Sequence, residues 1–562
     1  MFPRLNRFRN PKLTWLAWVI ATAGTLCVAP VCAAQEAAKV YEVQGVVLNS
    51  VTHQPIARAL VDGQQDAILT DNDGRFELHL PEGGTQIIVR RPGFSQQQGI
   101  GHFVAVGANL PAFTFYLIPQ ASITGRVTLS TGEAADDVRF TAYRKWNVNG
   151  HARWMMQGMY VTDSEGVFHM TDLEAPDSYM ICSASSQEGA GNPAPGTIRY
   201  GYPPVCYPGA ADPSSASALT VTPGQQADAE FTLTRQPFYR VTIAGAKSEK
   251  GQPMGIQIHD QSGRGMSFPA QWREQLGASE AYLPNGHYYA EAQIRGESSA
   301  YGRIDFSVAD GPVRGLNLVT LPLHTIPVQI RKEFTESNSG GGAVFYSGPS
   351  ANGPGSQQNE PNPGLMLTLS SDDATMGNMG GAPLRHVRGS QDPDAFELSE
   401  QTPGRYWVRT YAFQGYVSSI TSGGVDLARE PLVIGPGGAA APIEITVRND
   451  GGRITGTVGS GTPQGSTVGE LSAFISAIPL FPTTSQMPMA GVYGGNGTFT
   501  LMNVPPGSYR IVASEKPQEI DIGDAQEMAR VTAGGQTVTV EAGGTVNVQI
   551  DAVQPGKGES NQ

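Results

Sequence analysis

The sequence predicts an all-β protein, built as a tandem array of about five small antiparallel β-sandwich domains after a signal peptide. One phrase returns five times: a short apolar strand, a glycine, a few polar residues and a second alternating strand. The marker glycines are Gly107, Gly224, Gly311, Gly437 and Gly543. They lie roughly a hundred residues apart, which is the size of one small sandwich. With 69 Gly, 41 Pro and 40% hydrophobic residues, the composition favours many short strands joined by tight turns over disorder.

A second phrase precedes the first and indicates the type of sandwich. A glycine turn leads into a strand of period 2, then a Pro-Gly type turn, then another such strand whose aromatic residue is predicted to face the core. It occupies residues 494–513, 162–181, 70–78 and 396–406. The opening strands contain Gly45, Gly125 and Gly456.

This pattern resembles the bacterial carboxypeptidase regulatory-like, or transthyretin-like, domain. The resemblance implies prealbumin-like sandwiches, and the wider fold of that family includes carbohydrate-binding modules. It covers residues 40–90, 121–235 and 452–552 well. The third domain keeps only 283–288, and 416–447 looks like the family's final part. Gln86 stands where the family usually has a tyrosine.

The repeats divide the chain into seven predicted parts. These are a signal peptide (1–34), regulatory-like sandwiches one (35–119) and two (120–235), divergent sandwiches three (236–325) and four (326–449), regulatory-like sandwich five (450–552) and a disordered tail (553–562). Residues 337–363 are rich in Gly, Ser, Asn and Pro. This segment and residues 371–394 are too polar for core strands and are predicted to be long loops of the fourth domain.

The N-terminus predicts export. Four basic residues precede an apolar run over 13–31, and Cys32, Ala33 and Ala34 provide small residues for cleavage before Gln35. A retained signal anchor is the alternative, since about 19 apolar residues can span a bilayer. The predicted location is the periplasm, the outer surface or the exterior, with no membrane insertion after cleavage.

Cleavage would change the charge and the cysteine count. Removing four basic residues takes the net charge from −13 to −17, so no nucleic-acid partner is predicted. The two remaining cysteines, Cys182 and Cys206, both lie in the second domain and predict a disulfide in an oxidising compartment. The alternative is one buried strand thiol and one loop thiol.

Motifs for catalysis and cofactors are missing from the sequence. It contains no His-Glu-x-x-His, Gly-x-Ser-x-Gly, P-loop or dinucleotide fingerprint, so we predict no enzyme activity, no metal and no cofactor. His287 and Glu291 form a close pair, but their strand setting favours a structural role. The calcium-like run 71–74 lacks acidic ligands at Leu69 and Leu80 and is predicted to be a turn.

The strongest hairpin signal is Asn149-Gly150 between two alternating runs. A two-residue loop places Trp146 opposite Arg153 and Lys145 opposite Trp154, so the two indoles point to opposite sides. Whichever indole faces solvent is predicted to stack on a sugar ring, with Tyr143 and Tyr160 as neighbours and Arg153 or Lys145 as support. Core packing is the alternative for each residue.

Three functions fit the sequence. The favoured one is an exported, non-enzymatic binding or scaffold protein that holds a polysaccharide or an envelope protein. The second is a purely structural spacer array, and the third is a hydrolase with an unrecognised site near Trp272, Arg273 and Glu274. Short linkers at 119–120, 235–237 and 449–450 predict limited flexibility between domains. The sequence assigns no oligomeric state.

Overall fold

The computed structural model describes most of the chain after the N-terminal segment. The described residues are 39–95, 102–108, 110, 112–148, 151–189, 198–211, 213, 215–245, 254–261, 267–294, 299–335, 363–372, 380–381, 383–458, 471–485, 487–493, 497–514, 520, 524–533 and 535–550. The predicted signal peptide and tail lie outside these ranges, as do most of the predicted loop 337–363 and the Asn149-Gly150 turn.

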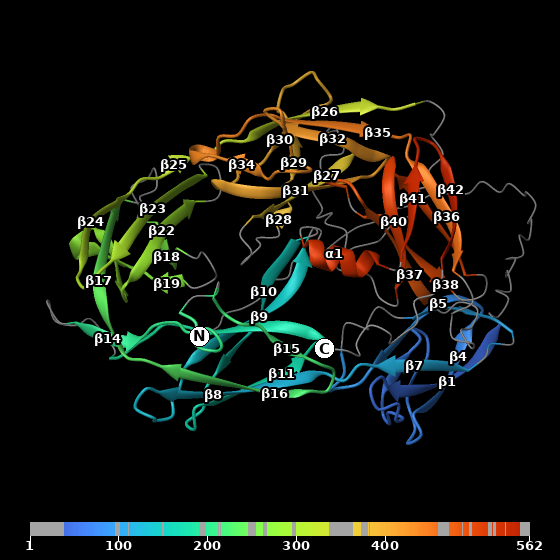
Figure 1. The fold of residues 1–562 in the computed structure, drawn as a ribbon, viewed down its shortest axis with the longest axis horizontal. Helices are drawn as coiled ribbons and strands as arrows, with labels where there is room; N and C mark the ends of the chain where they lie inside the picture. The colour runs from blue at the N-terminus through green and yellow to red at the C-terminus, as the bar shows by residue number, and fades with distance from the viewer. Residues whose placement is uncertain are drawn as a thin grey trace, which may run out of the picture. The chain divides into compact units, whose positions relative to one another are not determined.

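The predicted all-β array of sandwiches is confirmed. Within the described residues the strands form ten sheets, and the one α-helix is α1 (Ala525–Thr532). The sheets face each other in five successive pairs, and each pair encloses its own cluster of buried apolar side chains. In Figure 1 the five pairs follow one another in colour, from blue for the first sandwich to red for the fifth. The exact domain limits remain predictions.

The first two sandwiches share one plan, a three-stranded sheet packed on a four-stranded sheet. The first has β4 (Arg75–Pro81), β1 (Val40–Asn49) and β7 (Phe113–Leu117) against β3 (Ala67–Leu69), β2 (Leu60–Asp62), β5 (Gly83–Arg90) and β6 (His102–Val106). The second has β11 (Val167–Leu173), β8 (Ala121–Leu129) and β16 (Gln226–Leu233) against β10 (His151–Val161), β9 (Arg139–Val148), β12 (Asp177–Ser183) and β15 (Leu219–Val221).

The first sheet of the third sandwich includes the hairpin of β13 (Ser186–Gln187) and β14 (Arg199–Tyr202), which precedes the linker at 235–237 in the sequence. This sheet orders β13, β14, β17 (Gln236–Gly245), β21 (Ala278–Leu283) and β20 (Gln271–Arg273), with β24 (Val313–Leu318) also on β17 and the 3₁₀ turn η2 (Glu274–Leu276) after β20. The second sheet orders β19 (Ser267–Pro269), β18 (Ile256–Asp260), β22 (Gly286–Ile294), β23 (Ala300–Val308) and β25 (Leu321–Pro322).

The fourth and fifth sandwiches complete the array. The fourth pairs β29 (Leu384–His386), β30 (Ala395–Leu398), β26 (Ile326–Glu333), β35 (Ile443–Arg448), β32 (Tyr416–Ser422) and β33 (Val425–Asp426) with β28 (Gly380–Gly381), β27 (Leu365–Ser371), β31 (Gly404–Ala412) and β34 (Leu432–Ile434), followed by η4 (Pro436–Gly438). The fifth pairs β39 (Thr498–Val504), β36 (Gly452–Val458) and β42 (Thr545–Ile550) with β38 (Met489–Tyr493), β37 (Leu471–Pro479), β40 (Gly507–Ser514) and β41 (Gln536–Val540).

Two features differ from the sequence prediction. Residues 371–394, predicted to be loop, contain the short strands β28 and β29; both lie at sheet edges, where a strand pairs on one side only and needs little apolar sequence. The sheets are also not purely antiparallel. In every sandwich the opening long strand pairs in parallel with a strand near the end of the sandwich, as β1–β7, β8–β16, β17–β24, β26–β35 and β36–β42.

Steric crowding explains why the opening strand has a glycine. Gly125 lies directly opposite Phe168, and a Cβ atom on this glycine would sit 2.0 Å from the phenylalanine ring. The same glycine-phenylalanine pairing joins Gly45 to Phe76 and Gly456 to Phe499. The ring therefore covers backbone that a side chain would otherwise protect, which is the aromatic rescue known from strand glycines.

The predicted core aromatic is a tyrosine that fastens its own turn. Its hydroxyl donates to a backbone carbonyl four or five residues earlier, as Tyr179 to Glu174 (2.8 Å), Tyr288 to Pro284 (2.9 Å), Tyr406 to Thr402 (2.9 Å) and Tyr509 to Pro505 (2.7 Å). A buried hydroxyl needs such a partner. The first sandwich has Gln86 at this position, which carries no hydroxyl.

Candidate functional site: the β9–β10 hairpin

The hairpin of the second sandwich has the predicted register. Arg153 lies opposite Trp146, and Trp154 lies opposite Lys145. A β-bulge interrupts the pairing between Met156 and Gly158. The two indoles consequently lie on opposite faces of the ribbon, because side chains directly across two strands share a face.

On the inner face, Trp146 is half-buried and lies against a fixed cation. The Arg144 guanidinium carbon is 4.7 Å from the indole centroid. Its Nη2 is 2.5 Å from Oδ2 of Asp177, and both side chains are largely buried. Burial raises the pKa of Asp177, and the charge and hydrogen bond of Arg144 lower it only in part. The ion pair therefore holds the guanidinium in place on the indole.

On the outer face, Trp154 packs against the disulfide. Tyr143, Met180, Cys182 and Cys206 form a small buried cluster there, and Trp154 lies partly buried against it. Burial raises the pKa of the Tyr143 phenol. Tyr143 is 4% exposed, so it supports Trp154 from beneath and offers little surface to a ligand.

The remaining predicted residues lie apart from the indoles' open surfaces. Arg153 is buried and donates from Nη2 to the backbone oxygen of Ser371 at 2.7 Å, and a cation over the Trp146 ring is Arg144. Tyr160 packs partly buried against the main core, and burial raises its pKa. Lys145 is exposed. Sequence reasoning missed Arg144, although its position two residues before Trp146 puts it on the same face.

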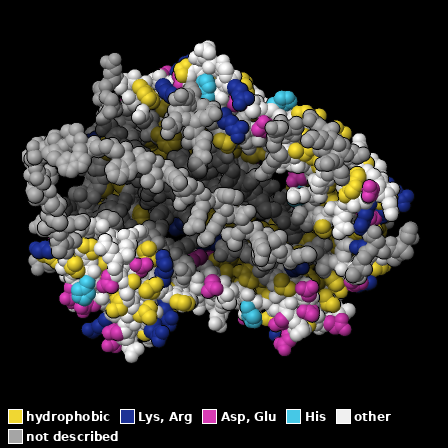
Figure 2. Space-filling model, turned by 180° about the vertical axis from the view of Figure 1, so that it is seen from behind, with side chains coloured by type: hydrophobic (Ala, Val, Ile, Leu, Met, Phe, Trp, Pro, Cys, Tyr) yellow, Lys and Arg dark blue, Asp and Glu magenta, His cyan; other side chains and the backbone are white. Residues whose placement is uncertain are grey.

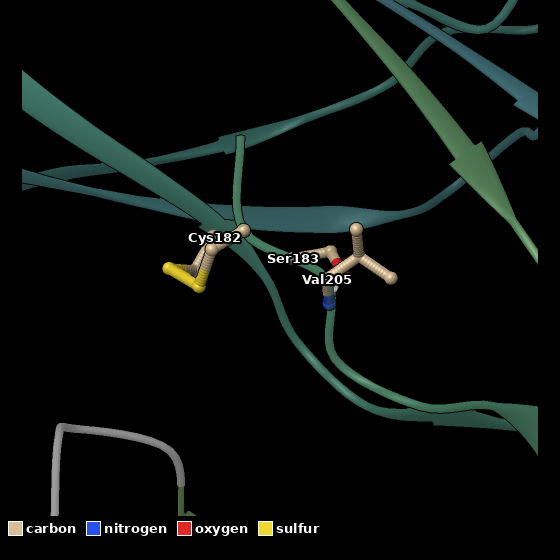
Figure 3. Close-up of a disulfide and its surroundings, with 4 residues drawn as sticks. Cys182, Ser183 and Val205 are labelled. Atoms are coloured by element: carbon tan, nitrogen blue, oxygen red, sulfur yellow. Dashed lines mark hydrogen bonds between the residues drawn. A yellow bond between two sulfur atoms is a disulfide. The ribbon is translucent and has the colours of Figure 1, made fainter. Parts of the chain in front are cut away.

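The predicted disulfide between Cys182 and Cys206 is confirmed. Figure 3 shows it beside Ser183 and Val205, which exchange two hydrogen bonds: Ser183 N to Val205 O at 2.8 Å and Val205 N to Ser183 Oγ at 2.9 Å. The bond closes a loop across a sequence separation of 24 residues. Strands β13 and β14 lie within that loop, so the disulfide also fastens the hairpin that joins the third sandwich.

The pair His287 and Glu291 and the run 71–74, considered in the sequence as metal sites, are bonded to neighbouring residues. Glu291 pairs with His259 (3.4 Å) and accepts from Tyr301 (2.9 Å), while His287 bonds with Ser307. The Asp71 carboxylate accepts two backbone amides of its own turn, those of residues 73 and 75, as predicted for a plain turn.

The region in which the sequence allows a hydrolase site contains an ion pair. Arg273 binds the buried Glu280 at 2.9 Å, and Glu274 is exposed in η2. Across the described part of the chain, no three His, Cys, Asp or Glu residues are grouped as a metal site would need. The described helix is too short to span a bilayer.

Comparison with known proteins leaves the family open. No family model and no curated protein matches the chain. The similar solved structures include the Bacillus anthracis TIE protein, at 10% identity over 74% of this chain and 68% of that one, with a TM-score of 0.15. They also include a streptococcal ancillary pilin, at 12% identity over 57% of this chain and 99% of that one, with a TM-score of 0.17. A pilus adhesin of Lactobacillus rhamnosus GG covers 50% of this chain and 43% of its own, at 10% identity and a TM-score of 0.16. Scores this low carry no functional argument.

Proposed function

We propose that the chain is an exported, non-enzymatic scaffold that presents binding surfaces from stiffly joined sandwiches. The observation that supports it is the position of the marker glycines. Gly224 N donates to Pro119 O (3.2 Å), Gly543 N donates to Asp450 O (2.6 Å), and Gly437 O accepts from His324 N (3.1 Å). In three sandwiches, the turn before the last strand therefore bonds to the linker by which the chain enters that sandwich.

The parallel pairing explains this contact. Because the last strand runs beside the first and in the same direction, the turn that precedes the last strand lies next to the start of the first. A linker that is bonded to the sandwich it enters cannot swing freely about it. A flexible string of domains would need no such bonds.

The linker between the second and third sandwiches is fastened by side chains as well. Both Nε and Nη2 of Arg235 donate to the Glu188 carboxylate at 2.7 Å, and the guanidinium carbon lies 3.9 Å from the Tyr200 ring centroid. Gln187 Nε2 donates to Tyr282 O at 3.0 Å. Strand β14 before the linker also pairs with β17 after it. Residues on both sides of the linker therefore belong to one sheet.

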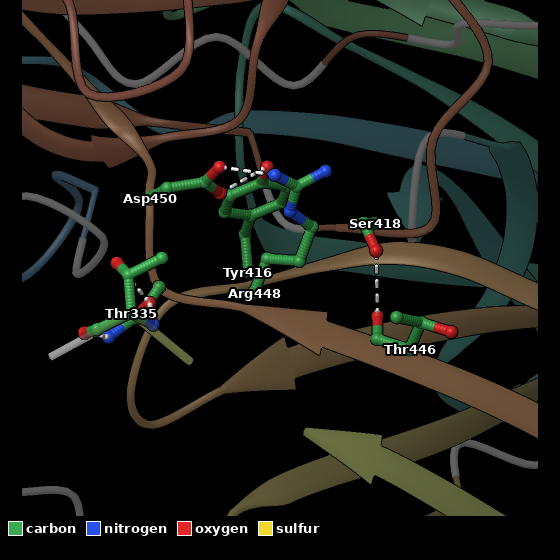
Figure 4. Close-up of polar contacts among 7 residues, drawn as sticks. Thr335, Tyr416, Ser418, Thr446, Arg448 and Asp450 are labelled. Carbon is green, nitrogen blue, oxygen red and sulfur yellow. Dashed lines mark hydrogen bonds and ion pairs between the residues drawn. The ribbon is translucent and has the colours of Figure 1, made fainter. Parts of the chain in front are cut away.

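The linker before the fifth sandwich is fastened at two adjacent residues. Asn449 exchanges hydrogen bonds with Thr335, whose N donates to Asn449 Oδ1 at 2.8 Å while Asn449 Nδ2 donates to Thr335 O at 3.0 Å. Asp450 accepts from Tyr416 Oη at 2.9 Å and pairs with Arg448. Figure 4 shows these contacts at the start and end of strands β32 and β35. Burial raises the pKa of Tyr416 to about 12, so it remains a neutral donor at neutral pH.

The test compares the shape of the mature protein with and without these bonds. We expect the double variant Arg235→Ala, Asn449→Ala to show a larger radius of gyration by small-angle scattering and faster proteolysis at 235–237 and 449–450. Arg303→Ala, which removes an exposed ion pair with Asp305 inside the third sandwich, is the matched control. A parent that already scatters as a flexible string, with no change in the double variant, would contradict the scaffold.

Polysaccharide binding at Trp146 is a second candidate, supported by the Arg144–Asp177 pair that fixes one side of the indole. A half-exposed, immobilised ring loses little entropy on stacking a sugar. We expect envelope polysaccharides to quench tryptophan fluorescence in the parent and in Trp154→Phe but not in Trp146→Phe. Equal quenching in the parent and Trp146→Phe would exclude this site.

The surface chemistry of the described residues is mixed. On the face drawn in Figure 2, acidic side chains are interspersed with Lys and Arg. This arrangement suits a scaffold whose net charge changes from −13 to −17 when the four basic residues of the predicted signal peptide are removed.

A further inference from the structure

The turn between β29 and β30 of the fourth sandwich contains an Asp-Pro bond, Asp392–Pro393. Both residues are exposed to water. The turn is nevertheless fastened to β26: Ile330 N donates to Asp394 O at 3.1 Å, and Lys332 Nζ lies 2.9 Å from Asp394 Oδ1. In the sheet, β30 lies between β29 and β26 (Figure 1). The bond is therefore open to solvent within a turn that three strands hold in place.

The carbonyl oxygen of Asp392 accepts two hydrogen bonds. His386 Nε2 lies 2.8 Å from it, and Ala395 N donates to it at 3.3 Å. The His386 ring is fixed edge to face against the ring of its cross-strand neighbour Phe396, with centroids 5.6 Å apart. Because a carbonyl oxygen only accepts, Nε2 carries the proton in this contact. Two donors therefore face the oxygen on which negative charge develops when the carbonyl carbon is attacked.

The carboxyl group of Asp392 is folded back along the same bond. Its Oδ1 accepts from Asp394 N at 2.9 Å, and its Oδ2 accepts from Gln329 Nε2 at 3.3 Å. The ring that the first of these hydrogen bonds closes contains the Asp392 carbonyl carbon and the Pro393 nitrogen. Asp392 N donates to Ser390 Oγ at 3.1 Å, which fixes the backbone on the other side of the residue. The carboxyl oxygens are therefore kept near the carbon that they would attack.

Proline makes this bond easier to break than other peptide bonds. Its nitrogen carries no hydrogen and belongs to a tertiary amide. When the bond breaks, that nitrogen leaves as a basic secondary amine, and an aspartyl carboxyl can close on its own main-chain carbonyl. The chain has one other Asp-Pro bond, Asp212–Pro213. It provides an internal comparison with the same two residue types.

We propose that the chain cleaves itself at Asp392–Pro393. An oxygen of the neutral Asp392 carboxyl attacks the main-chain carbonyl carbon of the same residue, while His386 Nε2–H and Ala395 N–H bind the oxyanion. The bond from that carbon to the Pro393 nitrogen breaks, the carboxyl proton passes to the nitrogen, and the aspartyl residue becomes a cyclic anhydride. A water molecule then opens the anhydride. The products are a chain that ends in a carboxyl at Asp392 and a chain that begins with the free amine of Pro393.

The fold keeps the two fragments together after cleavage. Strands β29 and β26 precede the bond in sequence, while β30 and β35 follow it, and the sheet orders them β29-β30-β26-β35. Each of the pairs β29–β30, β26–β30 and β26–β35 therefore joins one fragment to the other. Cleavage opens the turn without releasing either fragment from the sandwich.

The experiment is intact-mass analysis of the mature full-length protein after incubation in a mildly acidic buffer, because the step uses the neutral carboxyl. We expect one fragment that ends at Asp392 and one that begins at Pro393, which separate in denaturant and elute together in native size-exclusion chromatography. Cleavage should be about tenfold or more faster than at Asp212–Pro213 of the same molecules. This preference should disappear in urea, where neither carbonyl has its donors.

Two variants test the roles of the residues. His386→Phe keeps a ring against Phe396 and removes the donor, so it should slow cleavage about tenfold or more. Pro393→Ala makes the bond an ordinary secondary amide and should abolish cleavage. His287→Phe, at a histidine bonded to Ser307 in the third sandwich, is the matched control and should cleave as the parent does. Unchanged unfolding temperatures exclude a folding defect.

Three results overturn the proposal. The first is a native parent that stays intact, and the second is equal cleavage at Asp212–Pro213. The third is a rate that is the same in urea or in His386→Phe as in the native parent, because cleavage would then depend on the dipeptide alone and not on the turn.

Discussion

The second and third sandwiches share a seven-strand core, to which the third adds β13, β14, β20 and β25, and they pair its opening strand by different side chains. In the second, Phe168 covers Gly125, Phe140 stacks on Phe168 with centroids 4.5 Å apart, and a disulfide joins two cysteines 24 residues apart in sequence. In the third, no glycine-phenylalanine pair joins the opening strand β17 to β21, where Val241 faces Ala281 and Thr242 faces Glu280.

In the third sandwich a buried carboxylate lies on β21 beside the opening strand. Glu280 is 6% exposed and lies between Arg240 (2.5 Å) and Arg273 (2.9 Å). Arg303 and His259 lie against the Tyr289 ring on the other sheet, and Glu291 ties His259 to Tyr301. Both sandwiches keep the tyrosine bond to its turn, whereas the glycine-phenylalanine pair of the second is replaced in the third by other pairs on β17 and β21.

Removing the disulfide should give the largest effect, and only in the second sandwich. Replacing Cys182 and Cys206 with Ala should lower the free energy of unfolding of residues 120–235 by about 3 kcal/mol, the loop-closure contribution for a loop of this length. Hydrogen exchange with mass spectrometry reads each sandwich separately. Amides of β14 and the start of β17 should exchange faster too, and equal protection in parent and variant would show that the hairpin does not depend on the cross-link.

A side chain at Gly125 should be the next most damaging change. In Gly125→Ala the new methyl would overlap the Phe168 ring, because its Cβ would lie 2.0 Å from ring atoms. We expect a loss of about 2 kcal/mol from overpacking. Gly255→Ala in the third sandwich is the control, since no atom lies within 4 Å of a Cβ there. Equal unfolding temperatures for the two variants would remove the steric explanation.

Glu280→Gln should destabilise the third sandwich and leave the second unchanged. Breaking a fully buried pair costs about 3–5 kcal/mol; we expect about 2 kcal/mol here, because both arginines keep roughly a third of their side chains in water. Thermal unfolding of the full chain, with exchange to locate the loss, measures this.

The pH dependence of the same site has a definite sign. Burial raises the pKa of Glu280, but the hydrogen bonds and charges of Arg273 and Arg240 lower it more, so the folded pKa lies below the usual value. Its stabilisation is present above the unfolded pKa of about 4.3 and is lost as the pH falls through the folded pKa. The third sandwich of the parent should lose stability in that acid range, and Glu280→Gln should lose less; equal acid sensitivity would contradict this assignment.

Removing the tyrosine hydroxyl should give the smallest loss of stability, and the same loss in both sandwiches. Tyr179→Phe and Tyr288→Phe each remove one hydrogen bond to a backbone carbonyl, so each should cost about 1 kcal/mol. Differential scanning calorimetry can resolve shifts of this size. A cost confined to Tyr179→Phe would mean that the bond matters only beside the disulfide.

The sequence by itself determined the local parts of this protein. The turns at marker glycines, the period-2 strands and the cysteine pair are set by residues close in the chain, so the all-β array, the hairpin register and the disulfide were predictable. Gln86 stands in the first sandwich where the other four have a tyrosine bonded to its turn. These features depend on backbone conformation and on the alternation of side chains, which neighbouring residues impose.

The tertiary structure alone decided which distant residues became partners. Asp177 bonds to Arg144, 33 residues away in sequence. Glu291 pairs with His259 although His287 is nearer in sequence. Pro119 O accepts a hydrogen bond from Gly224 N, more than a hundred residues further along the chain. Whether Met159 is covered or exposed depends on β10 lying at the edge of its sheet, and strand order is fixed by the balance of all pairings in the sandwich. No local pattern encodes that balance, because an edge strand and a central strand of the same sequence differ only in what lies beside them.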